Sequence, residues 1–276
     1  MTASHPVPVP LNNRAILTLG GPDRKKLLQG IITNNVDKIA PGQMIYAALL
    51  TPQGKYLFDF FLSEFDEVLF LDCEVDRATD LLRRLMMYKL RADVEIKDVS
   101  ALYRVVAGQG IGDAFDKACP DPRHAGLGFR AIVPQEEAAE LPDDISAYET
   151  TRLRLGIPDG ARDFDVDKTL ILEGNMEELH GVDFNKGCYV GQEVTARMKH
   201  RTSLKKRLLP VTVNGPLPAR GSEICNSAGK KVGDIRSGFA DRAIGYFRLA
   251  DLTFGDIYTC GDATVTPEQP DWIKDI

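Results

Sequence analysis

The stretch Asn185–Glu193 reads NKGCYVGQE and places one cysteine, Cys188, between two glycines. Lys186 stands two residues before this cysteine and Glu193 five residues after it. From Phe184 to Arg207 the chain contains seven Lys and Arg residues and one acidic residue, a net charge of +6, although the whole chain carries −6. Nearby cations lower the pKa of a thiol and favour the reactive thiolate. The stretch therefore marks Cys188 as a candidate functional thiol.

The same residues leave two interpretations of Cys188 open. A short helix is expected over residues 191–198, and its first-turn amides, together with Lys186, could activate the thiol. Gly187 and Gly191 could allow a ligand to approach the backbone closely or could adopt a positive φ. Most free cysteines, however, are small buried hydrophobic residues, and Cys188 could be one of them.

Composition narrows the class of protein. The 276 residues are 43% hydrophobic and 27% charged, which is typical of a soluble globular chain with a large core and more than one domain. No run approaches the about 20 apolar residues that span a bilayer, so no membrane association is expected. The acidic balance, and a basic run without interleaved aromatic residues, argue against nucleic-acid binding. The N-terminal residues resemble neither a signal peptide nor a transit peptide, so a cytoplasmic location is expected.

The cysteines and histidines predict neither disulfides nor a metal site. There are five cysteines, an odd number, spread along the chain without a Cys-x-x-Cys pair. The four histidines do not cluster with any cysteine in the sequence. A disulfide framework and a metal centre built from neighbouring ligands are therefore not expected.

Periodicity predicts an α+β body followed by an all-β segment. Strands are expected at 14–19, 44–50, 56–62 and 68–72, and helical character at 145–155, before the breaker Gly156–Pro158. After Arg207, short strand candidates alternate with turns that contain Gly and Pro. That spacing predicts a small separate β-barrel or sandwich.

Three charged positions outside the thiol stretch, and Glu193 at its end, are candidates for function. Asp59 interrupts the apolar strand at 56–62 and is either solvent-facing or a buried functional acid, because an unpaired buried charge is costly. Arg152 and Arg154 lie on different faces of the 145–155 helix, so one of them could reach inward. Glu193 could either interact with the dipole of its helix or accept hydrogen bonds from an amino-heterocycle.

The octapeptide Lys186–Glu193 resembles the signature of the YgfZ family, folate-binding relatives of the glycine-cleavage T protein. Mitochondrial members of that family assist iron–sulfur cluster assembly. Four further segments resemble the family pattern and extend the resemblance over most of the chain: Leu28–Asn34, Asp121–Arg130, Arg152–Pro158 and Val232–Gly238.

The resemblance implies an α+β, three-domain cloverleaf like the glycine-cleavage T protein, arranged around a central folate channel. Residues 1–20 and 101–203 would form a split ferredoxin-like folate-binding domain. Residues 21–100 would form an inserted α+β domain, and residues 204–276 a small C-terminal β-barrel.

The resemblance also implies a site. Cys188 would be the reactive residue, and tetrahydrofolate or a derivative would be the cofactor. Asp59 falls where the T protein has its key aspartate, after the Thr-Pro-x-Gly turn at 51–54. The residues expected to bind the cofactor are Asp59, Arg152, Lys186, Gly187, Tyr189, Gly191, Gln192 and Glu193. Asp59 and Cys188 are expected to face one cavity.

Three functions stay open at this point. The leading hypothesis is a tetrahydrofolate-binding factor for assembly or repair of iron–sulfur proteins, a monomer whose partners are iron–sulfur client or carrier proteins. Cys188 would reduce a client cluster, ligate it transiently or exchange sulfur with it. The alternatives are a glycine-cleavage aminomethyltransferase and a non-catalytic folate-binding scaffold. Against the aminomethyltransferase, Arg154 replaces a glutamate with which the T protein binds the pterin. Whether the protein is an enzyme is left open.

Overall fold

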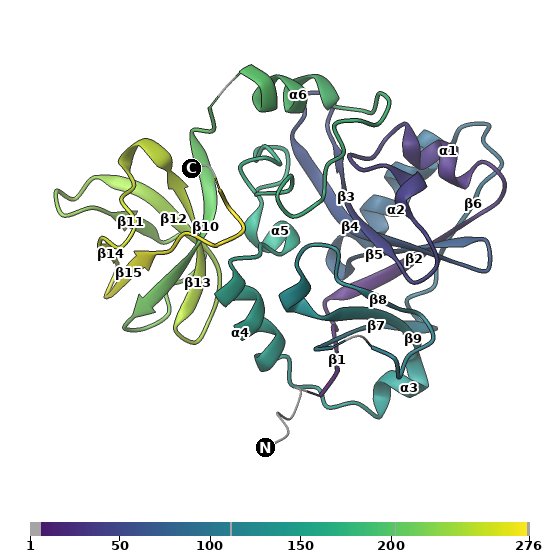
Figure 1. The fold of residues 1–276 in the computed structure, drawn as a ribbon, viewed down its shortest axis with the longest axis horizontal. Coiled ribbons are helices and arrows are strands. Elements are labelled where there is room, and N and C mark those ends of the chain that lie inside the picture. Colours follow the sequence, from purple (N-terminus) through teal and green to yellow (C-terminus); the bar gives the residue numbers. More distant parts are fainter. Residues whose placement is uncertain (1–6, 111, 202, 275–276) are drawn as a thin grey trace.

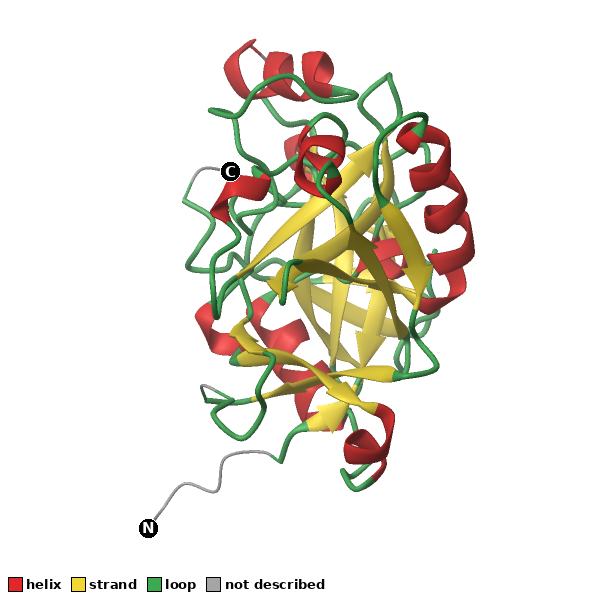
Figure 2. Cartoon of the chain, turned by 90° about the vertical axis from the view of Figure 1, so that its right-hand side faces the viewer, coloured by secondary structure: helices red, strands yellow, loops and turns green. Residues whose placement is uncertain are grey.

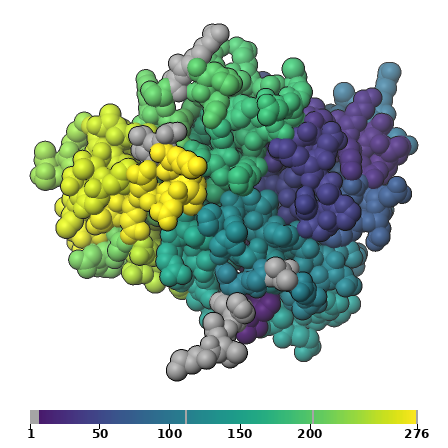
Figure 3. Space-filling model, in the orientation of Figure 1, coloured from purple at the N-terminus to yellow at the C-terminus, as the bar shows by residue number. Residues whose placement is uncertain are grey.

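Three groups of strands make up the protein (Figure 1). The computed structural model describes residues 7–110, 112–201 and 203–274. Within them, a five-stranded sheet, a four-stranded sheet and a closed barrel follow one another, and helices fill the spaces between them. In the space-filling view the barrel and the N-terminal sheet lie on opposite sides of the molecule (Figure 3).

The five-stranded antiparallel sheet has the order β3-β4-β5-β2-β6. Apolar side chains on one of its faces pack against two helices and form the first core, which includes Leu28 and Leu85 from the helices and Phe60 and Leu71 from the sheet. Figure 2 shows these strands through the centre of the molecule with helices along both sides. The elements are β2 (Arg14–Gly20), α1 (Arg24–Gln29), η1 (Val36–Lys38), β3 (Met44–Leu50), β4 (Tyr56–Phe65), β5 (Val68–Glu74), η2 (Val75–Arg77), α2 (Ala78–Lys89) and β6 (Glu95–Asp98).

The four-stranded sheet has the order β1-β7-β9-β8 and leads into the helices of the central segment. Its elements and those that follow are β1 (Val9–Pro10), β7 (Tyr103–Gly108), β8 (Ala118–Pro120), η3 (Ala125–Leu127), β9 (Phe129–Pro134), α3 (Gln135–Ala139), α4 (Ser146–Leu155), α5 (Gly160–Asp163) and α6 (Gln192–Arg201). α4 ends at Gly156, whose φ of +73° is the left-handed conformation that glycine adopts at helix ends.

The C-terminal barrel closes in the order β10-β13-β12-β11-β14-β15. Its core is a separate apolar cluster that includes Val211, Val232 and Phe247. The elements are β10 (Lys206–Asn214), β11 (Glu223–Cys225), β12 (Lys231–Phe239), β13 (Arg242–Arg248), η4 (Leu249–Asp251), β14 (Tyr258–Cys260) and β15 (Ala263–Pro267).

A central core joins the three groups. It contains Tyr46 and Phe61 from the second face of the five-stranded sheet, Leu153 from α4, and Leu208 and Ile244 from the barrel. Cys119 of β8 belongs to the same cluster, so the three groups share one buried interior.

The structure confirms the predicted α+β class and the predicted C-terminal barrel. The helix expected at 191–198 is α6, which begins at Gln192 and extends to Arg201. One placement differs from the implied layout: β2, inside the predicted 1–20 segment, pairs with β5 and β6 in the five-stranded sheet. The β2 segment RAILTLG suits the interior of that sheet because five of its seven residues are buried.

Candidate functional site

Cys188 lies at the surface, in the loop that leads into α6. Lys186, two residues earlier, is only 7% exposed. Its Nζ donates hydrogen bonds of 2.7 Å to the carbonyl oxygens of Ile32 and Asn34, and it lies 5.2 Å from the ring centroid of Tyr189. Burial lowers the Lys186 pKa to about 8. The ammonium group therefore ties this loop to the segment between α1 and η1.

The residues after Cys188 anchor the other side of the loop. Tyr189 is buried in the central core, and Val190 packs against the first core. Gly191 has a φ of +84°, and a Cβ there would lie 2.5 Å from the carbonyl oxygen of Thr51. Only glycine fits at such a position. The anchors on both sides leave the thiol exposed on a fixed loop.

Gly187 differs from Gly191. A Cβ at Gly187 would meet nothing within 4 Å, and its φ lies outside the left-handed region. The steric reason for glycine that we inferred from the sequence therefore holds at Gly191 and not at Gly187.

The segment that accepts the Lys186 bonds is itself fixed to the thiol loop. The Thr33 hydroxyl donates to the Gly181 carbonyl at 2.7 Å, and the Thr33 carbonyl accepts from the Asp183 amide at 3.0 Å. The Asn34 amide donates to the carbonyl oxygens of Tyr46 and His180. These contacts give the Thr33-Asn34 pair a physical role: it holds residues 180–186 against β3.

Local carboxylates balance much of the positive charge that follows Cys188. Glu193 and Arg197 form an ion pair of 2.7 Å on the surface of α6. Lys199 pairs with Glu177, and Arg207 pairs with Glu178. The basic run is therefore partly neutralised in the folded protein.

The other cysteines lie in different surroundings. Of the five, all within the described ranges, Cys188 alone is exposed; Cys225 is half-buried, and Cys73, Cys119 and Cys260 are buried. Burial raises the pKa of Cys73 to about 12 and that of Cys119 to about 11, which keeps both thiols protonated. Within the described ranges, no group of three or more His, Cys, Asp or Glu residues is placed to hold a metal ion.

Asp59 lies in the interior, on the sheet face that borders the central core. It is 5% exposed, and its carboxylate accepts hydrogen bonds from the hydroxyls of Tyr56 at 2.7 Å and Tyr46 at 3.0 Å. Burial and the charge of Asp59 raise the pKa of both tyrosines well above the usual value. Asp59 is thus a buried, hydrogen-bonded acid, the second of the two environments considered from the sequence.

Glu74, at the end of β5, lies beside Asp59 and was not among the predicted site residues. A Cβ on Gly160 would lie 3.1 Å from Oδ1 of Asp59 and 3.6 Å from Oε2 of Glu74. That Glu74 oxygen is buried and has no hydrogen-bond partner among the described residues. Burial raises the Glu74 pKa, and the charges of Asp59 and Asp159 raise it further. Sequence alone offers no signal here, because the pairing of β4 with β5 creates the site.

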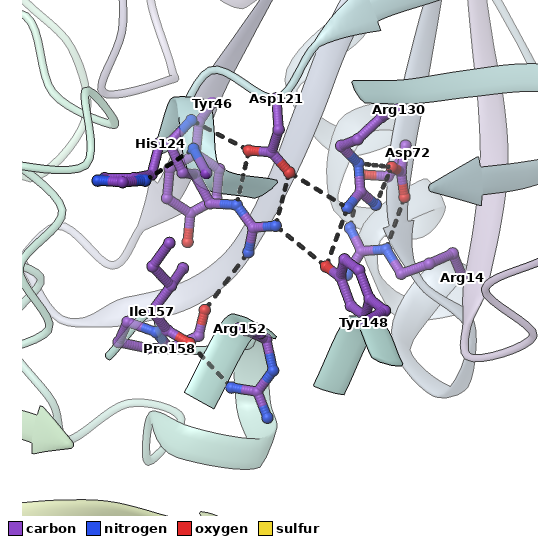
Figure 4. Close-up of polar contacts among 12 residues, drawn as sticks. Arg14, Tyr46, Asp72, Asp121, His124, Arg130, Tyr148, Arg152, Ile157 and Pro158 are labelled. Atoms are coloured by element: carbon purple, nitrogen blue, oxygen red, sulfur yellow. Dashed lines mark hydrogen bonds and ion pairs between the residues drawn. The ribbon is translucent and has the colours of Figure 1, made fainter. Parts of the chain in front are cut away.

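A buried cluster of arginines surrounds Phe61, two residues after Asp59. The guanidinium carbons of Arg130, Arg123 and Arg14 lie 4.0, 4.8 and 5.6 Å from its ring centroid. Asp72 binds Arg14 and Arg130, and Asp121 binds Arg123 (Figure 4). Tyr148 accepts from Arg123 at 3.1 Å and from Arg130 at 3.4 Å. These contacts join β2, β5, β9 and α4 beneath the central core.

Arg152, which we expected to bind the cofactor, has a different role in the structure. It is completely buried, and its five N–H groups are all used. They donate to both oxygens of Glu149, to Asp163, to the Ile157 carbonyl and to the Ser237 hydroxyl. With no donor left for a ligand, Arg152 joins α4 to the barrel. Arg154 is exposed, as expected for the opposite face of the helix.

The predicted site residues therefore fall into four places. Lys186, Gly187, Tyr189, Gly191 and Gln192 share one loop with Cys188, where the Gln192 side chain accepts from the Tyr189 amide at 3.3 Å. Glu193 lies on the surface with 85% of its side chain exposed, in the environment of a first-turn helix acid. Asp59 lies in the interior and Arg152 in the α4–barrel network. A cavity shared by Asp59 and Cys188 stays a prediction.

This arrangement of sheets and barrel defines the class of the fold. A crystal structure of the glycine cleavage system aminomethyltransferase T from Bartonella henselae superposes with a TM-score of 0.77, covering 96% of this chain and 86% of that one. The sequence identity is 15%, so the likeness concerns the fold. Residues 12–111 match the GCVT N-terminal domain, and residues 205–275 match the CAF17 C-terminal β-barrel domain.

Relatives in other organisms identify the family. The mitochondrial iron-sulfur cluster assembly factor IBA57 of Homo sapiens is 31% identical over 83% of this chain and 73% of its own length. The IBA57 homolog of Neurospora crassa is 34% identical over 72% of this chain, which spans about half (52%) of that protein. This chain belongs to the CAF17/IBA57/YgfZ family. None of the helices in the described ranges combines the length and the apolar character needed to cross a membrane.

Proposed function

We propose that this protein assists the assembly or repair of iron–sulfur proteins through the thiol of Cys188. The observation that carries the proposal is the exposure of this one thiol on a loop fixed by Lys186 and Gly191. A fixed, accessible sulfur can meet a metal cluster on another protein, whereas the buried thiols of this chain cannot. Relatives that are named iron-sulfur cluster assembly factors support the proposal.

A transient ligand role fits the surroundings of Cys188 best. One thiol supplies one ligand to iron, so a carrier or client protein must supply the others. In the exchange, Cys188 loses its proton and forms an Fe–S bond while a carrier thiolate leaves the iron and takes up a proton. No electron is transferred, so the step needs no second cysteine of this chain.

Tetrahydrofolate or a derivative is the cofactor we propose for the central interior. Asp59 retains free lone pairs beyond those used by Tyr46 and Tyr56, and the orphaned oxygen of Glu74 lies beside it. Such acceptors fit the N–H groups of an amino-heterocycle. When bound, tetrahydrofolate would supply nitrogen atoms that carry one-carbon units. The chain's own contribution is to hold and orient it, chiefly through Asp59.

Complementation tests the proposal. A strain that lacks its endogenous homologue receives wild type, Cys188→Ala, Asp59→Ala or the control Cys225→Ala, at matched protein levels. Wild type and Cys225→Ala should restore the activities of iron–sulfur enzymes, and Cys188→Ala should not. Full rescue by Cys188→Ala would contradict the thiol mechanism. Loss of rescue by Asp59→Ala, with normal folding, would support a role for the interior site.

Separate tests distinguish the proposal from two other functions. Glycine-cleavage activity in a system reconstituted without the T protein would establish an aminomethyltransferase. Failure to bind tetrahydrofolate in calorimetry, together with rescue by Asp59→Ala, would favour a scaffold without a folate site. A monomeric state and a cytoplasmic location stay predictions, which light scattering and localisation of the tagged protein would check.

A further inference from the structure

We propose that Glu74 is a second ligand-binding carboxylate, and that Glu74 and Asp59 together accept hydrogen bonds from two N–H groups of an amino-heterocycle. The inference rests on the proposed folate site and adds to it a residue that decides which ligands fit. A single carboxylate accepts from many donors, whereas two carboxylates at a fixed spacing select a ligand with two donors on one edge.

The pairing of the strands brings the two acids together. In the β4–β5 register Phe60 lies opposite Cys73 and Phe61 opposite Asp72, so one further step places Asp59 opposite Glu74. Directly opposite residues of an antiparallel pair point to the same face, with their Cβ atoms about 4.5–5.5 Å apart. The position of Gly160, close to an oxygen of each, agrees with that placement.

The charges of this pair are only partly balanced within the chain. Arg14 and a backbone hydrogen bond from Ala161 lower the Glu74 pKa, but burial and the charges of Asp59 and Asp159 raise it on balance. Like charges directly opposite each other destabilise a sheet. Arg14 lies opposite Glu74 on β2, but its Nε donates to Asp72 at 2.6 Å and its Nη2 to the Asp72 carbonyl at 2.9 Å. Oε2 of Glu74 is left buried without a partner. A neutral glutamine of the same shape would avoid this repulsion, so the acid is unfavourable for the fold itself.

Gly160 lies close to both acids on a common side. A side chain at this position would press against Oδ1 of Asp59 and approach Oε2 of Glu74. Its φ of +45° is also a conformation that other residues rarely adopt. Glu74 itself is half-buried, and its Oε2 is buried.

The test combines ligand binding with stability. Calorimetric titration with tetrahydrofolate is carried out on wild type, Glu74→Gln, Asp59→Asn and the control Glu223→Gln, whose glutamate is exposed on the barrel. Urea unfolding is measured on the same proteins. We expect Glu74→Gln to weaken binding by about tenfold or more, because a charge-assisted hydrogen bond is lost. The urea midpoint of Glu74→Gln should equal or exceed that of wild type. Glu223→Gln should change neither the affinity for tetrahydrofolate nor the urea midpoint.

The outcomes separate the two proposals. If wild type binds and Glu74→Gln binds equally well, the inference on Glu74 is wrong and the folate site stands. If Glu74→Gln loses affinity and stability together, Glu74 is a structural residue and the inference is again wrong. If wild type does not bind tetrahydrofolate, the folate site fails and the role of Glu74 fails with it.

Discussion

Nζ of Lys186 lies 2.7 Å from the carbonyl oxygen of Asn34, a residue 152 positions earlier in the chain. A second bond of the same length joins Nζ to the carbonyl of Ile32. A buried lysine that donates to two backbone carbonyls fixes its own loop against the segment between α1 and η1. Cys188, two residues further on, is held at the surface as a consequence.

Lys186→Met should loosen the thiol loop. The methionine keeps much of the apolar stem but leaves two carbonyl oxygens without donors, a loss of about 1–3 kcal/mol in the free energy of unfolding. Urea unfolding measures the loss, and hydrogen exchange should show faster exchange of amides 183–191. Lys205→Met, at an exposed lysine, is the control and should change neither the free energy of unfolding nor the exchange of these amides. Unaltered exchange of the loop in Lys186→Met would contradict the anchoring role.

The two glycines beside Cys188 should respond differently to alanine. Gly191→Ala places a Cβ 2.5 Å from the Thr51 carbonyl at a φ of +84°, and should destabilise the protein by about 1–3 kcal/mol. Gly187→Ala introduces a methyl group into open space and should leave the free energy of unfolding within about 0.5 kcal/mol of wild type. The urea midpoints of Gly191→Ala and Gly187→Ala measure the two losses of stability. Equal losses in both variants would show that the loop geometry is wrong.

The sequence identified the thiol loop because its residues lie side by side in the chain. Glycine, lysine and cysteine in one short stretch carry a local signal, and in the structure Gly191 and Lys186 both make contacts that hold the loop. The C-terminal barrel was also predictable, since short strands separated by Gly and Pro follow from local rules. Periodicity placed Asp59 on an apolar strand, although only the structure supplied Tyr46 and Tyr56 as its partners.

The rest depended on contacts between distant residues. Arg152 bonds to Ser237, 85 positions later, and nothing near Arg152 in the sequence indicates that all its donors are used. Glu74 became visible as the partner of Asp59 only through the β4–β5 register. Glu193 carried an ambiguous signal, because a first-turn helix acid and a ligand-binding acid have the same local sequence.

Asp72→Asn should be severely destabilising. Asp72 is 3% exposed and binds Arg14 at 2.6 Å and Arg130 at 2.5 Å. Removing its charge leaves two buried guanidinium groups poorly compensated, which typically costs about 3–5 kcal/mol. Thermal and urea unfolding measure the loss, and the exposed pair Glu193–Arg197 supplies the comparison. Glu193→Gln should cost at most about 0.5 kcal/mol. Similar losses in the two variants would refute the burial argument.

The effect of Glu74→Gln on stability should depend on pH. The pKa of Glu74 is raised above its usual 4.5 by burial and by Asp59 and Asp159. Between pH 4.5 and the raised pKa, the folded protein binds more protons at this group than the unfolded chain does, so wild-type stability contributed by Glu74 falls as pH rises. Glutamine does not titrate. The stability advantage of Glu74→Gln should therefore be small at pH 4 and grow towards neutral pH.

Urea unfolding of wild type and Glu74→Gln at several pH values from 4 to 8 measures this difference. Because all other titrating groups are common to the two proteins, their contributions largely cancel in the comparison. A difference that is constant over the range, or that shrinks as pH rises, would contradict the like-charge pairing of Glu74 with Asp59.

The most direct measurement of the central claim is cluster transfer in a defined mixture. A purified carrier loaded with an iron–sulfur cluster, an apo iron–sulfur enzyme and this protein are combined, and recovery of the enzyme's activity is followed. Wild type and Cys225→Ala should accelerate the recovery to the same extent, whereas Cys188→Ala should leave it at the rate seen without added protein. Equal acceleration by Cys188→Ala and wild type would show that the exposed thiol does not carry the function.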